Sequence, residues 1–333
     1  MKKIASMGFP LFVKWYITQR CNLRCTHCYL TDYTKSPTLD DVLPIVDFLG
    51  SKKVVSIVLI GGEPLARLDL VEIVSRISWN NIQTKIATNA TLADRAKATA
   101  LVEAGARKYQ VSLEGATAET NDLIRGNGTF MHATAGIRAL VAAGADVSVA
   151  FTLTGLNYRE VGSMFELASR LNATGIKLNA FIPMGTGRLL ARNHFLSPST
   201  CHQIADDILM YSARFPDLEV EAGAFVKKIG MPAIRPSSDS TFGCGAGTTS
   251  MIINSDLTLS ACDMLVEEDR TLQAIGSPSR IGDLWQHDPL FRRWRGHKDA
   301  HRTPTIKSFD GVHQHGCHVA FNAYRTNIFS GEQ

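Results

Sequence analysis

Six short apolar segments alternate with helical patterns over residues 1–185, and this alternation constrains the fold more than any other feature of the chain. The strand-like runs are Leu11–Thr18, Val54–Ile60, Thr84–Thr88, Lys108–Leu113, Asp146–Leu153 and Gly175–Ile182. Helical patterns lie between them, at Thr38–Leu49, Arg67–Ser78, Leu92–Ala104, Phe130–Ala143 and Tyr158–Leu171. Strand and helix in alternation predict an α/β fold with a parallel sheet. Because a closed eight-unit barrel usually needs roughly 250 residues, six units predict a partial, TIM-like (β/α)6 barrel.

The alternation ends after Ile182, and two further parts follow. Prolines punctuate residues 186–240, which are expected to form a connecting region with one helix, Ser199–Phe215. Residues 241–333 are rich in turns, and the alternating stretch Thr249–Cys262 predicts a β-hairpin that turns at Asn254–Asp256. The sequence therefore predicts a barrel (1–185), a connecting helical region (186–240) and a small C-terminal domain (241–333).

Composition excludes several classes of protein. The chain has 333 residues, of which 45% are hydrophobic and 20% are charged, as expected of a folded enzyme. Its net charge of +4 is modest, and the basic run Phe291–Arg295 is interpreted as a solvated helix end, so no nucleic-acid partner is expected. The sequence has no run of eighteen apolar residues, so no membrane span is predicted. The apolar start lacks a cleavage site, so no signal peptide is predicted. Seven cysteines without an even disulfide framework favour a reducing cytoplasm.

Three cysteines directly after the first strand-like run carry the strongest chemical signal. Cys21, Cys25 and Cys28 could hold three irons of a cubane [4Fe–4S] cluster and leave the fourth iron open to a ligand. A structural zinc ion would need a fourth ligand such as His27. That residue lies between two of the cysteines, in a turn too tight for a tetrahedral site. A disulfide would leave one thiol unpaired and presupposes an oxidising compartment. Small buried hydrophobic side chains are the remaining alternative.

The spacing C-x3-C-x2-C, with the aromatic His27 just before the third cysteine, resembles the signature of the radical SAM superfamily. The resemblance implies that S-adenosylmethionine (SAM) chelates the open iron through its amino and carboxylate groups. An electron from the cluster then cleaves SAM to methionine and a 5′-deoxyadenosyl radical, which abstracts a hydrogen atom from the substrate. It also implies a site at the C-terminal ends of the strands and a flavodoxin- or ferredoxin-type reductant.

The same resemblance implies where SAM binds. Gly61 and Gly62 would let the backbone approach a ligand closely, and Glu63 would accept a hydrogen bond from an ammonium group. Taken alone, the segment Gly61 to Pro64 favours an ordinary strand-to-helix turn, and the cysteines beside it reverse that interpretation. The positions that match the family's pattern for SAM are His27, Gly61, Gly62, Glu63, Pro64, Asn89, Ser112, Glu114, Arg125 and Ile182.

Each of these positions has an implied partner in SAM. Ser112 and Glu114 correspond to positions that bind the ribose or carboxylate of SAM, and Arg125 to an arginine that reaches its carboxylate. Asn89 ends the third strand, and Ile182 at the sixth strand end is expected to pack against adenine. A capped helix start or a surface ion pair is the structural alternative for the polar positions.

The C-terminal cysteines resemble those of the SPASM domain, an auxiliary-cluster module of radical SAM enzymes that modify peptides and natural products. Cys244 and Cys262 flank the predicted hairpin, and Cys317 corresponds to the last of the SPASM run of four cysteines. The other three places of that run hold Pro304, Lys307 and His313, so a second auxiliary cluster lacks its ligands. One auxiliary [4Fe–4S] cluster is expected on Cys244, Cys262 and Cys317, nearer to the shortened "twitch" form. His313, His315, Cys201, a carboxylate or the substrate could supply its fourth ligand, and three unrelated buried thiols are the alternative.

Asp263 follows the hairpin cysteine directly and is the candidate catalytic residue. In peptide-oxidising relatives an aspartate at this place is thought to deprotonate the substrate radical, so a proton acceptor would stand beside an electron acceptor. A surface aspartate that caps the turn is the rival interpretation. Cys201 could instead donate a hydrogen atom, although a single cysteine on a predicted helix is usually a packed hydrophobic residue.

These features predict a radical SAM enzyme that oxidises or cross-links a ribosomally made peptide or a related natural product. The alternative is a dehydrogenase, epimerase or decarboxylase of a sugar, aminocyclitol or nucleoside. A non-catalytic iron–sulfur protein would explain the cysteines but would not need Gly61 to Pro64. The sequence names neither the substrate, nor the bond formed, nor the oligomeric state.

Overall fold

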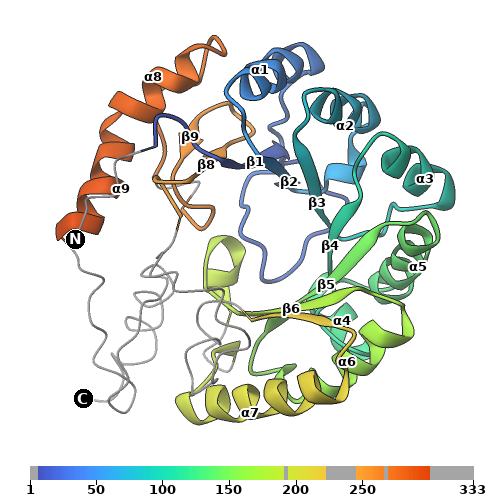
Figure 1. Cartoon of the computed structure of the whole chain (residues 1–333). Helices are drawn as coiled ribbons and strands as arrows, with labels where there is room; N and C mark the ends of the chain where they lie inside the picture. Colours follow the sequence, from blue (N-terminus) through green and yellow to red (C-terminus); the bar gives the residue numbers. More distant parts are fainter. Residues whose placement is uncertain (1–6, 191–193, 223–244, 266–268, 301–333) are drawn as a thin grey trace.

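The computed structural model describes residues 7–190, 194–222, 245–265 and 269–300, which form a nine-stranded sheet with helices around it. The order of the strands is β7-β6-β5-β4-β3-β2-β1-β8-β9, and neighbouring strands are parallel except for β8 and β9. The strands are β1 (Phe12–Thr18), β2 (Ser56–Gly61), β3 (Gln83–Thr88), β4 (Lys108–Ser112), β5 (Asp146–Leu153), β6 (Gly175–Ala180), β7 (Glu219–Ala222), β8 (Ser250–Ile253) and β9 (Leu259–Ser260). Figure 1 shows the strands curving as an arc inside a ring of helices.

Helices follow the strands and cover the outer face of the sheet (Figure 1). They are α1 (Leu39–Ser51), α2 (Leu70–Trp79), α3 (Arg95–Glu103), α4 (Ala118–Arg125), α5 (Thr129–Ala142), α6 (Val161–Arg170), α7 (Pro198–Arg214), α8 (Arg280–His287) and α9 (Pro289–Ala300). Local sequence fixes several of their starts: Thr38 and Asp41 form a capping box at α1, and Ser197 caps α7. Short 3₁₀ turns lie at Pro64–Ala66, Tyr158–Glu160 and Gly185–Leu189.

The two faces of the sheet differ in polarity. Along β1, Val13, Trp15 and Ile17 are fully buried and belong to the main hydrophobic core. The side chains between them, Lys14 and Tyr16, point to the other face, because side chains alternate along a strand. The same alternation continues through β2 to β6, where the helix-facing residues are buried and most inner residues are partly exposed. The core therefore lies between sheet and helices, and the inside of the barrel stays polar.

The structure confirms the predicted α/β architecture and adds strands at both edges of the sheet. β7 pairs with β6 and β8 pairs with β1, so segments from beyond residue 185 extend the parallel sheet. The predicted hairpin is present, with Ile252 opposite Ser260. Helix α4 was not predicted, because its eight residues are polar apart from Ala118, Leu123 and Ile124. The boundaries at residues 185 and 240 stay predictions, and the predicted ligands Cys244 and Cys317 lie outside the described residues.

None of the helices in the described ranges combines the length and apolar character that crossing a membrane requires.

Candidate functional site

The segment that carries the three cysteines leaves the end of β1 and is held by three neighbouring elements. The Gln19 amide donates to the Lys35 carbonyl at 2.8 Å, and the Thr26 amide donates to the Ile124 carbonyl of α4 at 3.0 Å. On the other side, the Thr186 amide donates to the carbonyl of Cys28 at 2.9 Å. We call residues 19–30 the cysteine loop; its position at the C-terminal end of a parallel strand is where such folds place their sites.

Each of the three thiols in the cysteine loop has one N–H donor. The backbone amide of Leu23 lies 3.4 Å from the Cys21 sulfur, and the amide of Leu30 lies 3.4 Å from the Cys28 sulfur. The Cys25 sulfur lies 3.9 Å from Nη1 of Arg125. Burial raises the pKa of Cys21 to about 11 and also raises the pKa of Cys25. None of the three is in a disulfide.

Gly61 and Gly62 let the end of β2 lie directly against the end of β1. The Gly62 amide donates to the Thr18 carbonyl at 2.8 Å. A Cβ atom at Gly61 would lie 2.0 Å from the Thr18 oxygen, and one at Gly62 would lie 2.3 Å from the Arg20 oxygen. Gly61 also has a φ of 144°, which disfavours any other residue. The close approach expected at these glycines is thus made by the chain's own backbone, at the base of the cysteine loop.

Glu63 is fully buried and joins the ends of β2 and β3. Its Oε1 accepts from the Leu65 amide at 2.9 Å and from the Thr88 hydroxyl at 2.6 Å, and its Oε2 accepts from the Asn89 amide at 2.7 Å. Burial raises the pKa of Glu63 although these donors act against it. Pro64 begins the 3₁₀ turn that follows. The carboxylate oxygens of Glu63 therefore face the protein's own donors in this structure.

Asn89 connects the end of β3 to the cysteine loop. Its Nδ2 donates to Oδ1 of Asn22 at 3.0 Å, and its Oδ1 accepts from the Thr91 amide at 2.9 Å. Nδ2 of Asn22 in turn donates to the Thr91 hydroxyl at 2.8 Å. This small network fixes the first turn of the cysteine loop.

Glu114, just beyond β4, is the centre of a buried charged cluster that we call the Glu114 cluster: His27, Glu114 and Arg125. Oε1 of Glu114 lies 3.1 Å from Nε2 of His27 and 2.8 Å from Nη2 of Arg125. Its Oε2 accepts from the Thr152 amide at 2.7 Å. Burial alone would raise the pKa of Glu114, but Arg125 and then His27 outweigh it and lower the pKa to about 2. The cluster joins β4, β5, α4 and the cysteine loop through one carboxylate.

Two polar atoms of the Glu114 cluster are buried and have no hydrogen-bond partner among the described residues: Nδ1 of His27 and Nε of Arg125. Buried polar groups normally have partners, so both atoms can be satisfied by a bound ligand. With three thiols in the same loop, these atoms fit a [4Fe–4S] cluster bound to a molecule that carries a carboxylate. Among the described residues, no group of three or more His, Cys, Asp or Glu side chains is arranged so that it could bind a single metal ion.

Two predicted positions lie at other strand ends. Ile182 follows β6 and packs with Met184, Tyr29, Met264 and Leu265 in a small apolar cluster beside the cysteine loop. Ser112 ends β4, on the inner face of the sheet, and is partly exposed. Both therefore border the same end of the barrel as the cysteine loop.

Asp263 lies after β9 and reaches the inner face of β1. Its carboxylate forms an ion pair with Lys14, and its carbonyl accepts from the Tyr16 hydroxyl at 3.0 Å. Burial would raise the pKa of Asp263, but Lys14 lowers it below its usual value. Burial raises the pKa of Tyr16, and the negative charge of Asp263 raises it further.

Sequence reasoning did not single out Lys14 and Tyr16. The signal that could have found them is their alternation with Val13, Trp15 and Ile17, since polar residues on the inner face of a barrel strand line the interior.

The other cysteines differ in their surroundings. Cys262 is buried at the end of the hairpin. Cys201 is 3% exposed within the main hydrophobic core, and burial raises its pKa to about 12. Its surroundings are those of a packed hydrophobic residue.

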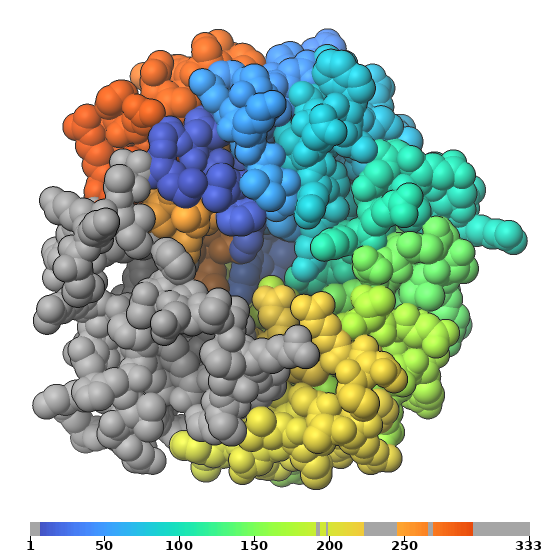
Figure 2. Space-filling view, in the orientation of Figure 1, coloured from blue at the N-terminus to red at the C-terminus, as the bar shows by residue number. Residues whose placement is uncertain are grey.

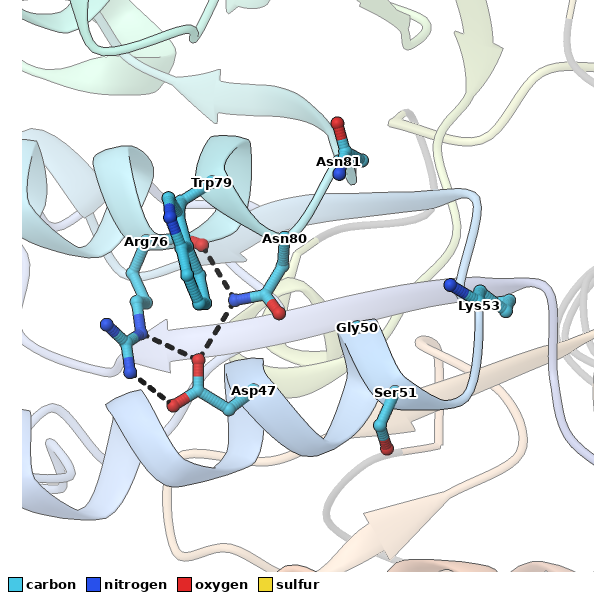
Figure 3. A pocket seen from close by; sticks show the side chains of 8 residues that line it. All are labelled: Asp47, Gly50, Ser51, Lys53, Arg76, Trp79, Asn80 and Asn81. Atoms are coloured by element: carbon cyan, nitrogen blue, oxygen red, sulfur yellow. Dashed lines mark hydrogen bonds and ion pairs between the residues drawn. The ribbon is translucent and has the colours of Figure 1, made fainter.

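A pocket of about 490 Å³ lies at the far ends of α1 and α2 (Figure 3). Arg76 and Asp47 form a two-bond ion pair across it, both at 2.6 Å, and Asn80 donates to Asp47 at 2.9 Å. Because α1 and α2 end just before β2 and β3 begin, this pocket lies near the N-terminal ends of the strands. The cysteine loop lies at their C-terminal ends.

Comparison with known proteins places these residues in context. The model of the family "Radical SAM superfamily" matches residues 15–168. The mycofactocin maturase MftC of Mycobacterium ulcerans is 27% identical over 320 residues, which cover 93% of this chain and 84% of MftC. The AdoMet-dependent heme synthase of Methanosarcina barkeri is 33% identical over 189 residues, 55% of this chain and 54% of the synthase.

Among solved structures, Streptococcus suis SuiB bound to precursor peptide SuiA has a TM-score of 0.77 at 18% identity. The match covers 94% of this chain and 73% of SuiB, and at this identity it shows a shared fold. The matched family range contains the cysteine loop, the two glycines and the Glu114 cluster, whereas Asp263 lies beyond it.

Proposed function

Because the chain is a radical SAM enzyme, we propose that it is a maturase that oxidises or cross-links a ribosomally made peptide. The observation that carries the proposal is the match to the mycofactocin maturase, which spans 93% of this chain rather than the radical SAM domain alone. The fold shared with SuiB over 94% of the chain supports it, since that structure holds a precursor peptide.

The family implies a [4Fe–4S] cluster and SAM, which together supply the radical that removes a hydrogen atom from the substrate. We propose that Cys21, Cys25 and Cys28 ligate the cluster. Arg125 and His27 then stand beside it with one unsatisfied nitrogen each, suited to the carboxylate of SAM. Glu114 holds both in place, so it acts as a positioning residue.

Asp263 is proposed as the group that accepts the substrate proton. The ion pair with Lys14 keeps its carboxylate ionised at neutral pH, because the pKa of Asp263 is lowered. A lowered pKa also makes it a weaker base, and contact with the substrate in place of Lys14 would restore its basicity. The hydrogen bond from Tyr16 to the Asp263 carbonyl holds this loop against β1.

The auxiliary cluster belongs to the same proposal. Cys262 is buried next to Asp263, while Cys244 and Cys317 lie outside the described residues. Two features stay predictions: the SPASM or twitch character of residues 241–333, and the flavodoxin- or ferredoxin-type reductant.

Anaerobic turnover tests the proposal. Reconstituted protein with dithionite and SAM should release 5′-deoxyadenosine, and Cys25→Ala should abolish this while Cys201→Ala, in the core, should not. With a peptide encoded beside the gene, mass spectrometry should show the loss of two hydrogen atoms from the peptide. Release of 5′-deoxyadenosine with every such peptide unchanged would contradict the maturase proposal.

A tetrapyrrole is the second candidate substrate. It is favoured by the 33% identity to the heme synthase and to the Fe-coproporphyrin III synthase of Methanosarcina barkeri, although these matches cover 54% and 50% of those proteins. Incubation with Fe-coproporphyrin III under the same conditions separates the two candidates, since only a tetrapyrrole-modifying enzyme should change its absorption and mass.

A further inference from the structure

The side chain of Arg67, just beyond the 3₁₀ turn that begins at Pro64, is almost completely buried, with 6% of it exposed. Its Nε and Nη2 donate to the two carboxylate oxygens of Asp69 at 2.9 and 2.7 Å. Because this two-bond pair balances the charge of the guanidinium, the third nitrogen, Nη1, can serve as a donor to neutral groups.

Nη1 of Arg67 joins the two ends of the segment that carries the three cysteines. It donates to the Ile17 carbonyl, before the cysteine loop, at 2.8 Å and to the Pro37 carbonyl, after the loop, also at 2.8 Å. The Ser36 hydroxyl lies 3.2 Å from the same nitrogen. Since residues 18–35 lie between these acceptors, one nitrogen closes the base of a long segment that is mostly neither helix nor strand.

The turn before Arg67 is itself attached to the cysteine loop. The Glu63 amide donates to the Arg20 carbonyl at 2.9 Å, and the Arg67 amide donates to the Pro64 carbonyl at 3.0 Å. Both segments belong to the blue to cyan part of the chain, which forms one continuous region of the surface in Figure 2. Arg67 therefore connects the segment Gly61 to Pro64 with both ends of the cysteine loop.

Asp69 supports this arrangement from an unusual position. It is the N-cap residue of α2, where an aspartate normally accepts a hydrogen bond from an amide of the first helical turn and stabilises the helix. Asp94 at α3 makes such a bond. The carboxylate of Asp69 instead faces Arg67. The chain thus uses this carboxylate to fix the guanidinium rather than to cap the helix.

We propose that Arg67 is a positioning residue for the iron–sulfur cluster, because it keeps the base of the cysteine loop closed. Ordering a flexible segment opposes the binding of a ligand, so a loop that is held closed in advance retains its ligand longer. The role rests on the proposed ligation of the cluster by Cys21, Cys25 and Cys28. The contacts of Arg67 are present in the chain without the cluster.

Retention of the cluster by the reconstituted full chain measures this role without SAM, reductant or substrate. With excess EDTA under argon, iodoacetamide alkylates each ligand thiol as the cluster leaves, and peptide mass spectrometry follows Cys21, Cys25 and Cys28 separately. Arg67→Gln should shorten the half-time of protection about tenfold, which is equivalent to roughly one charge-assisted hydrogen bond. Ser36→Ala, which removes a single acceptor, should shorten it about threefold.

Arg76→Gln is the matched control. Arg76 and Asp47 form the same kind of two-bond pair near the N-terminal ends of the strands (Figure 3). This variant should protect the three thiols as wild type does, even where urea unfolding shows that it loses as much stability as Arg67→Gln. Arg67→Lys retains a donor for the two carbonyls and should restore part of the protection.

Equal half-times for Arg67→Gln and Arg76→Gln, or for Ser36→Ala and wild type, would overturn the proposal. Ser36→Ala removes no charge and decides the question if Arg67→Gln does not fold. Alkylation of the three thiols in wild type before EDTA is added would instead contradict the proposed ligation of the cluster. Because the assay involves no turnover, failure of the peptide test in the previous section leaves this result independent.

Discussion

Replacing Glu114 with glutamine should destabilise the fold, because three separate elements depend on this one carboxylate. Oε1 accepts from Arg125 at 2.8 Å and contacts His27 at 3.1 Å, while Oε2 accepts from the Thr152 amide at 2.7 Å. An amide would turn an NH₂ group toward one of these donors. It would also leave the Arg125 guanidinium, 10% exposed, without its anion.

The size of the effect follows from the pKa. Glu114 titrates at about 2 rather than at 4.5, and its side chain is 1% exposed, so solvent screening is small. The difference corresponds to about 3 kcal/mol of stability, similar to the roughly 3–5 kcal/mol lost when one partner of a buried ion pair is removed. Since the pKa is depressed on folding, this stability is present in full above pH 4.5. It is lost as the pH falls from 4.5 toward 2.

Urea unfolding followed by circular dichroism measures this contribution. At pH 7, Glu114→Gln should reduce the free energy of unfolding by about 3 kcal/mol, and the gap from wild type should narrow as the pH falls below 4.5. Glu119→Gln, an exposed position on the same helix α4, is the matched control and should stay within about 0.5 kcal/mol of wild type. A gap below about 1 kcal/mol at pH 7, or one that does not narrow in acid, would refute the assigned role of Glu114.

Three further outcomes are expected. Gly62→Ala should lower iron incorporation during reconstitution, because its Cβ would lie 2.3 Å from a backbone oxygen at the base of the cysteine loop; normal iron content would show that the loop adjusts. Wild type should bind about eight irons and the Cys21→Ala, Cys25→Ala, Cys28→Ala variant about four, as expected for two cubane clusters; a variant without iron would exclude the auxiliary cluster. Asp263→Asn should still release 5′-deoxyadenosine but form less product, and unchanged product formation would dismiss Asp263 as the base.

The sequence predicted the order of the elements well because local patterns determine it. All six predicted strands form, and β5 has the predicted bounds, Asp146–Leu153. Alternating burial and the positions of turns are properties of neighbouring residues, which can be read along the chain. Helix α4 escaped prediction because its few apolar residues give no long periodic signal, although its last residue, Arg125, was already a candidate.

The pairing of strands that are distant in the chain was harder to predict from the sequence. β8 lies beside β1, although residue 250 is far from residue 12 in the chain, and this contact brings Asp263 to Lys14. No pattern within either segment specifies the other as its partner, because strand pairing depends on the whole sheet.

The sequence by itself determined the chemistry that the chain can host: three cysteines at a fixed spacing at the end of a strand and a pair of glycines after the next strand are local features. Only the tertiary structure decided how the charges are shared. It placed Arg125 and His27 on Glu114 and paired Lys14 with Asp263. The physical reason is that electrostatic interactions depend on distance and burial in space, and closing the sheet into a barrel brings together side chains that are far apart in sequence.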